Sequence, residues 1–174
     1  DTYIQYGEIT AQSIIFCEGY KSVSNPWFHH LPFENAKGEI LTVKCTTLPS
    51  NTIFNNGKWL CPTSSPGTYR YGTTSYWEFQ NNNPEEAGTT LLKESLSKWI
   101  KHPTQIDRID AGVRPILKNR RPIYGFHPNH PRIGLINGLG GQGTLLAPLV
   151  IQAFTKALET DSNIPLTELP SIKG

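Results

Sequence analysis

Residues 111–154 read AGVRPILKNRRPIYGFHPNHPRIGLINGLGGQGTLLAPLVIQAF, and this stretch decides the fold. The apolar run from Arg132 to Asn137 predicts a strand, and the apolar residues from about Leu145 to Leu158 predict a helix. Between them lies GLGGQG, which has four glycines in six residues. The stretch therefore predicts a strand, a glycine-rich turn and a helix, in that order.

The glycine-rich turn, residues 138–143, also matches G-x-G-x-x-G, the pattern in which glycines let backbone N–H groups approach a pyrophosphate at a helix N-terminus. A Rossmann unit needs a second parallel strand about 30 residues later, ending in an acidic residue. The 31 residues after Gly143 end in a proline-containing tail instead. We therefore interpret the turn as a place where backbone approaches a planar or anionic ligand. The alternative is that its glycines only pack the helix on the strand.

The residues upstream of this stretch predict a sheet and one more helix. Asn83-Pro84-Glu85-Glu86 has a capping side chain, then proline at the first helical position, so a helix begins there and ends before Pro103. Asn-Gly at 56–57 predicts a hairpin with a type I′ turn, in which both central residues have positive φ. The predicted strands are Ile9–Cys17, Glu39–Thr46, Asn51–Phe54, Lys58–Cys61, Thr68–Thr74 and Arg108–Arg114. Sheet and helices together predict an α+β fold, with an antiparallel or mixed sheet.

Composition narrows the functional class. The 174 residues carry a formal net charge of +2, which is too balanced for a dedicated nucleic-acid binder or a membrane-surface helix. Charged residues make up 17%, against about 25% in an average domain. A low fraction of charged residues is typical of a chain whose surface is partly buried against another protein segment, including a missing part of the same protein. Met is absent and the chain opens DTYIQ, so we expect an internal or C-terminal fragment.

The cysteines and histidines favour neither a disulfide framework nor a metal site. Cys17, Cys45 and Cys61 are widely spaced and predict reduced thiols. His29-His30 and the pair His127 and His130 lie in proline-broken loops and lack a third ligand of defined spacing. The sequence has neither a signal segment nor an apolar run of the ~20 residues that cross a bilayer. We therefore expect a cytoplasmic protein without a metal ion.

Arg114 is the one side chain that the residues themselves single out for binding. It lies between Gly112-Val113 and Pro115, so its guanidinium is well fixed, and a fixed guanidinium suits bidentate recognition of a carboxylate. From the residues alone, however, a structural salt bridge is the preferred interpretation of Arg114.

The order of these motifs resembles the D-amino-acid oxidase and glycine oxidase family of flavoproteins. The resemblance rests on the stretch quoted above and on IIFCEG, LPFENAKGEIL and TYRYGTTSYWEF, at residues 14–19, 31–41 and 68–79. It covers essentially residues 9–158. The family begins with a βαβ unit that carries the true dinucleotide fingerprint, and this chain resembles only the C-terminal half.

The resemblance implies an FAD-dependent oxidoreductase that acts on an amine or amino acid, with much of the FAD bound by the missing N-terminal part. It implies a division into an FAD-domain segment (1–36), a substrate domain (37–110), a return into the FAD domain (111–160) and a tail (161–174). Arg114 matches the arginine that pairs with the substrate carboxylate, and Tyr71 and Tyr76 lie where pocket-lining side chains are found. The residues expected to face the flavin are Gly19, Gly138, Leu139, Gly140, Gly141, Gln142, Gly143 and Thr144.

Two alternatives stay open at this point. One is the flavin module of a tRNA-modifying enzyme, which has the same family fold; the balanced charge speaks against nucleic-acid binding by this chain. The other is a non-catalytic ligand-binding or interaction module. The residues name neither the substrate nor the electron acceptor nor the oligomeric state, and they single out no catalytic residue.

Overall fold

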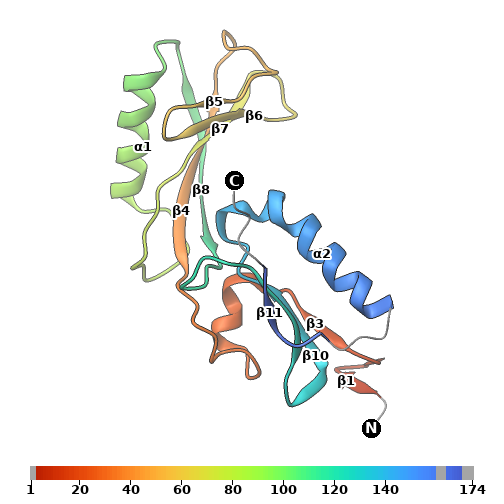
Figure 1. Cartoon of the computed structure of the whole chain (residues 1–174). Coiled ribbons are helices and arrows are strands. Elements are labelled where there is room, and N and C mark those ends of the chain that lie inside the picture. The colour runs from red at the N-terminus through yellow and green to blue at the C-terminus, as the bar shows by residue number, and fades with distance from the viewer. Residues whose placement is uncertain (1–2, 160–163, 170–174) are drawn as a thin grey trace. The chain divides into compact units, whose positions relative to one another are not determined.

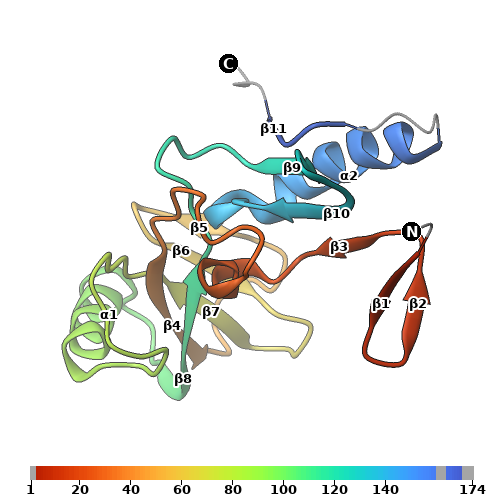
Figure 2. The same ribbon diagram turned by 90° about the horizontal axis from the view of Figure 1, so that it is seen from below.

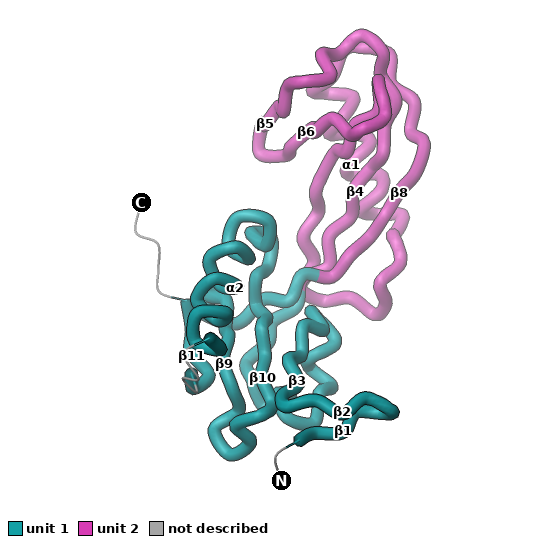
Figure 3. Tube along the Cα trace, turned by 90° about the vertical axis from the view of Figure 1, so that its right-hand side faces the viewer, with its two compact units in different colours: residues 1–35, 114–174 teal, residues 36–113 magenta. Residues whose placement is uncertain are grey.

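A computed structural model describes residues 3–159 and 164–169, and the chain forms two compact units (Figure 3). Unit 1 is made of residues 1–35 and 114–174, and unit 2 is the continuous segment Ala36–Val113. Among the described residues, no helix is long and apolar enough to span a membrane.

Unit 2 contains a five-stranded sheet and one helix (Figure 1). The strand order is β5-β6-β7-β4-β8, and the pairs β5–β6, β6–β7 and β4–β7 are antiparallel. The element bounds are β4 Ala36–Lys44, β5 Phe54–Asn55, β6 Trp59–Pro62, β7 Thr68–Gly72, α1 Glu86–Trp99 and β8 Gln105–Arg114.

The core of unit 2 follows from two periodicities. Leu41 and Val43 on β4, and Tyr69 and Tyr71 on β7, alternate with residues that face away, so they share one face of the sheet. The helix α1 covers this face with Leu92 and Leu96, which are one helical turn apart. All of these side chains are buried. This packing accounts for the helix and strands that the sequence predicts here.

Two local predictions in unit 2 are wrong. The hairpin forms, but of Asn55, Asn56 and Gly57, all of which the structure describes, only Gly57 has a positive φ, at 74°. Its turn is therefore not type I′. The helix begins at Glu86 rather than at Pro84. The residue before it, Glu85, is held by the sheet, since its backbone N–H donates to the carboxylate of Glu39 on β4 at 2.8 Å.

Unit 1 contains a four-stranded sheet, order β11-β9-β10-β3, and a separate hairpin of β1 and β2. β10 is parallel to β3 and antiparallel to β9. The bounds are β1 Ile4–Tyr6, β2 Ile9–Ala11, β3 Ile14–Phe16, β9 Ile123–His127, β10 His130–Asn137 and β11 Thr167–Glu168. The helices are α2, Gly143–Glu159, and the short 3₁₀ segments η1, Gly19–Ser24, and η2, Gly140–Gln142.

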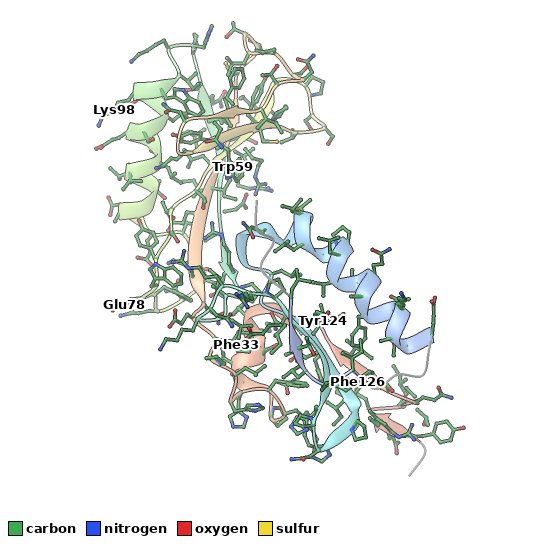
Figure 4. All side chains as sticks on the ribbon, in the orientation of Figure 1. Phe33, Trp59, Glu78, Lys98, Tyr124 and Phe126 are labelled. Carbon is green, nitrogen blue, oxygen red and sulfur yellow. The ribbon has the colours of Figure 1, made fainter. Side chains whose placement is uncertain are left out.

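This sheet is buried on both faces. Phe28 and Leu117 cover one face and pack on Ile133 and Leu135 of β10. The helix α2 covers the opposite face (Figure 2). Its Val150 and Phe154 pack on two aromatic side chains of β9, both of which are labelled in Figure 4. These are Tyr124 and Phe126, and the rings of Phe126 and Phe154 lie 5.4 Å apart. Because α2 covers one face of the sheet and the segments that carry Phe28 and Leu117 cover the other, β10 is buried on both faces. This explains the nearly continuous apolar run in its sequence.

Three predictions for unit 1 need correction. The expected strand Ile9–Cys17 is two strands, because polar residues 12–13 interrupt the run and residues 9–11 pair back with β1. β3 stops at Phe16, one residue before the predicted strand end at Cys17, and Gly19 begins η1. Residues 123–127, for which no strand is predicted, form β9. In the predicted tail, residues 167–168 pair with β9, while 161–163 and 170–174 lie outside the described residues.

Candidate functional site

The two parallel strands of unit 1 end at the same edge of their sheet, and a glycine follows each of them. Ile14–Phe16 on β3 pair in parallel with residues 133–135 on β10. Gly19 lies beyond the end of β3 with a φ of 60°, and Gly138 follows β10 with a φ of 75°. Residues other than glycine rarely adopt such φ values. In open α/β sheets the carboxyl edge of parallel strands is the edge where ligands bind.

The glycine-rich turn that follows β10 is held tightly from one side. A Cβ on Gly138 would lie 2.8 Å from Leu117 Cδ1, so packing as well as φ requires glycine there. The N–H of Gly140, whose φ is 54°, donates to the carbonyl of Pro115 at 2.9 Å. Leu139 is half-buried and packs beside the α2 core. One side of the turn thus packs against the segment after Arg114. Gly141, Gln142 and Thr144 lie on the other side of the turn.

These three residues are exposed, and α2 begins among them. The first turn of an α-helix has N–H groups without intrahelical acceptors and the positive end of the helix dipole. The first turn of α2, residues 143–146, contains no acidic side chain that would neutralise this end. Gly141 has no steric reason to be glycine: its Cβ would meet nothing nearer than Arg114 Cδ at 3.7 Å. This end of α2 can therefore receive an anionic or electron-rich group at close range.

Arg114, the last residue of β8, lies beside the turn. The same 3.7 Å spacing places its aliphatic stem next to Gly141. The side chain is half-buried, and desolvation lowers the pKa of its guanidinium from the ordinary value. A cation that has lost part of its hydration binds a carboxylate more strongly than a fully solvated one does. The structure thus brings Arg114 next to Gly141 of the turn.

Asn137 is a part of this site that the sequence analysis missed. Its side chain is 2% exposed, and its Nδ2 donates to the carbonyl of Gly19 at 2.9 Å and to Ser22 Oγ at 2.7 Å. Its Oδ1 accepts from the N–H of Gly138 at 2.8 Å. The available signal was a polar residue directly between an apolar strand and a glycine.

The two predicted pocket tyrosines lie in unit 2. Tyr71 is buried in the core, and its hydroxyl shares a 2.7 Å hydrogen bond with Ser95 Oγ. Tyr76 pairs through its backbone with Lys37. Desolvation raises the pKa of the Tyr76 hydroxyl, and the carboxylates of Glu39 and Glu85 raise it further, against the opposite effect of Lys37. Contact of either tyrosine with a substrate stays a prediction.

Four histidines from two distant stretches of sequence, His29 and His30 in the first and His127 and His130 in the second, gather at the other end of β9 and β10. The ring centroid of His127 lies 4.9 Å from that of His130 and 6.3 Å from that of His30. Trp27 packs edge-on against His130 at 4.5 Å. Within residues 3–159 and 164–169, no group of three His, Cys, Asp or Glu side chains is arranged to hold a metal ion. The three cysteines, all of them described, are free thiols.

Comparison with solved structures shows the fold. Glycine oxidase from Geobacillus kaustophilus superimposes with a TM-score of 0.73 at 20% identity, over 91% of this chain and 44% of that one. Iminodiacetate oxidase from Chelativorans sp. BNC1 gives a TM-score of 0.75 at 16% identity, over 95% of this chain and 45% of that one.

Sequence comparison gives the same assignment. The chain is 28% identical over 149 residues to glycine oxidase of Bacillus subtilis (strain 168), which covers 82% of this chain and 40% of that protein. It thus spans less than half the length of these relatives. The family model described as FAD dependent oxidoreductase (DAO) matches residues 3–157. The chain therefore belongs to the DAO family of FAD-dependent oxidoreductases.

Proposed function

We propose that the protein containing this chain oxidises an amine or an amino acid with FAD as cofactor, and that this chain supplies the substrate-binding arginine and one wall of the flavin site. The observation that carries the proposal is the position of Arg114 beside Gly141, at the exposed N-terminus of α2. The guanidinium of Arg114 suits a carboxylate, and the N-terminus of α2 suits an electron-rich ring. The relatives named as oxidases of glycine and of iminodiacetate support this class of substrate.

The residues of the turn fit a flavin at its pyrimidine end. Gly141 is exposed and has an ordinary φ, so a side chain would fit the fold, yet the position carries none. The N–H groups at the start of α2 can donate to the ring oxygens and nitrogens, and the helix dipole favours negative charge there. These residues would hold one end of the FAD ring, and the cofactor would supply the two-electron acceptor for the oxidation of the substrate.

Arg114 would hold the substrate by its carboxylate. A bidentate guanidinium–carboxylate pair fixes direction as well as position, so it would present one C–H bond of the substrate in a single orientation. The partial burial of Arg114 strengthens this pairing because less water competes for the guanidinium. Within this proposal, unit 1 belongs to the FAD domain and unit 2 to the substrate domain.

The test uses the full-length protein. We expect purified protein to show a flavin absorption band, and we expect that band to bleach without oxygen when a small amino acid is added. Protein that binds no flavin would contradict the cofactor assignment. Protein that binds FAD but is reduced by no amine or amino acid would contradict the substrate class. Extraction of nucleic acid with the protein would favour the tRNA-modifying alternative.

A further inference from the structure

The side chain of Asn137, the last residue of β10, connects the segments that follow the two parallel strands of unit 1. Its Nδ2 donates to Gly19 and Ser22 in η1, beyond β3, while its Oδ1 accepts from Gly138, directly after β10. The partners fix the orientation of the amide, since a carbonyl at Gly19 needs a donor and an N–H at Gly138 needs an acceptor. Aspartate, which has the same shape, would direct an oxygen at the Gly19 carbonyl.

The two backbone segments that Asn137 joins are 118 residues apart in the sequence, and each turns at a glycine in the left-handed region. Backbone pairing between β3 and β10 ends at Phe16 and Leu135. Beyond that point, the Asn137 side chain bonds both to η1 and to the glycine-rich turn. Because its amide is buried and has few rotatable bonds, it sets the spacing between Gly19 and Gly138 closely.

We infer that Asn137 is a positioning residue for the flavin: it fixes the distance between the Gly19 segment and the turn 138–144, so that both reach the cofactor at once. This inference rests on the proposed function. It adds a residue that touches neither flavin nor substrate and acts through the backbone of the two glycines. Its loss should loosen the wall of the site while the sheet behind it stays in place.

The test compares Asn137→Asp with Ser22→Ala in the full-length protein. Ser22 is fully buried and accepts one of the Asn137 bonds, so Ser22→Ala leaves both glycine contacts intact. We expect Asn137→Asp to weaken FAD binding roughly tenfold or more, as loss of a buried hydrogen bond would, and to shift the flavin reduction potential. We expect Ser22→Ala to lower the denaturation midpoint, with FAD affinity and potential close to wild type.

The inference is overturned if Asn137→Asp binds FAD with wild-type affinity and potential, or if both variants lose FAD affinity equally. Should Asn137→Asp fail to fold, Asn137→Ala takes its place, since alanine removes the bonds to both glycines without placing an acceptor opposite the Gly19 carbonyl. The same two outcomes then apply. Wild-type protein without flavin would instead count against the proposed function, so the two failures are distinguishable.

Discussion

The buried carboxylate of Glu39 caps the helix that follows Glu85. Glu39 lies on β4, and its Oε1 accepts the backbone N–H of Glu85 at 2.8 Å. Its Oε2 lies against Gly88 in the first turn of α1, where an added Cβ would come within 2.1 Å of it. Lys37, also fully buried, forms an ion pair with the Glu85 side chain and donates to the carbonyl of Asn83 at 3.1 Å. The start of α1 is thus built on the sheet.

Gly88→Ala should destabilise unit 2, although alanine is the better helix former. The new methyl group must displace the Glu39 carboxylate and break its bond to Glu85, and overpacking of this kind costs about 1–3 kcal/mol. The gain in helix propensity, about 1 kcal/mol, offsets part of this. We expect a net loss of up to about 2 kcal/mol in the free energy of unfolding, measured by urea denaturation.

Thr90→Ala is the matched control, because Thr90 is an exposed position of the same helix. It should leave stability unchanged or slightly raised. The double variant Glu39→Ala with Gly88→Ala should lose less than the sum of its parts, since the first change removes the group that the second one strikes. Strict additivity would show that the two residues do not interact.

Gly141→Ala separates a cofactor role of the glycine-rich turn from a packing role. The position has an ordinary φ and room for a Cβ, so the apoprotein should keep its stability within about 0.5 kcal/mol. If the turn lies against the flavin, the methyl group should weaken FAD binding several-fold in the full-length protein, measured by fluorescence titration. Unchanged FAD affinity, with unchanged stability, would remove Gly141 from the site.

Arg114→Lys should weaken binding of a carboxylate substrate. Lysine keeps the charge but loses the bidentate geometry, so we expect a loss of about 1–3 kcal/mol in substrate binding. The measurement is the substrate concentration that half-saturates flavin reduction in the full-length protein. An amine analogue that lacks the carboxylate is the control and should be affected much less. Equal losses for both compounds would give Arg114 a structural role.

Acid should weaken unit 1 through His127. Desolvation lowers the pKa of His127, and the positive charges of His130 and His30 lower it further. Its Nδ1 also accepts the N–H of Asn129 at 3.2 Å, which favours the neutral ring. Because the unfolded chain binds a proton more readily, this stabilisation is present above about pH 6.5 and is lost as the pH falls through the lowered pKa. We expect the urea midpoint to fall in that range.

His127→Asn tests this prediction, since the Asn Oδ1 can replace Nδ1 as acceptor but does not titrate. This variant should show a smaller fall in midpoint on acidification than wild type. His102→Asn is the control: His102 lies in unit 2, outside the cluster, and bonds to Thr47. It should keep the wild-type fall. An acid response that is the same in all three proteins would exclude His127 as its source.

Arg120→Gly should stabilise unit 1. Arg120 has a φ of 60°, in the left-handed region, and the turn is closed by its N–H, which donates to the carbonyl of Leu117 at 2.7 Å. The left-handed conformation costs a residue with a Cβ roughly 1–2 kcal/mol, and the greater chain entropy of glycine offsets part of the gain. We expect thermal denaturation to show a net gain of about 0.5–1 kcal/mol. A lower melting temperature would mean that the contacts of the Arg120 side chain outweigh the strain.

The sequence predicts well wherever local patterning and the buried face agree. Leu92 and Leu96 mark the inner face of α1, and residues 132–137 lie within β10, because periodicity and burial give the same answer there. It fails where a distant side chain decides. The start of α1 depends on Glu39, and the connection between the two glycine turns depends on Asn137 bonding across 118 residues. Likewise, β9 is a strand because β10 and α2 enclose it on two sides, despite its proline-rich flanks.

The division of unit 1 into two stretches of chain has a consequence for biosynthesis. Domains emerge from the ribosome N-terminal end first, at roughly 5–20 residues per second. Unit 2, residues 36–113, is complete before β9, β10 and α2 exist. β3 therefore leaves the ribosome without its parallel partner, with an apolar strand edge open to other chains. Residues 35 and 114 flank unit 2 in the chain, and early folding of unit 2 brings them together. The loop that closes when β10 pairs with β3 is then effectively shorter.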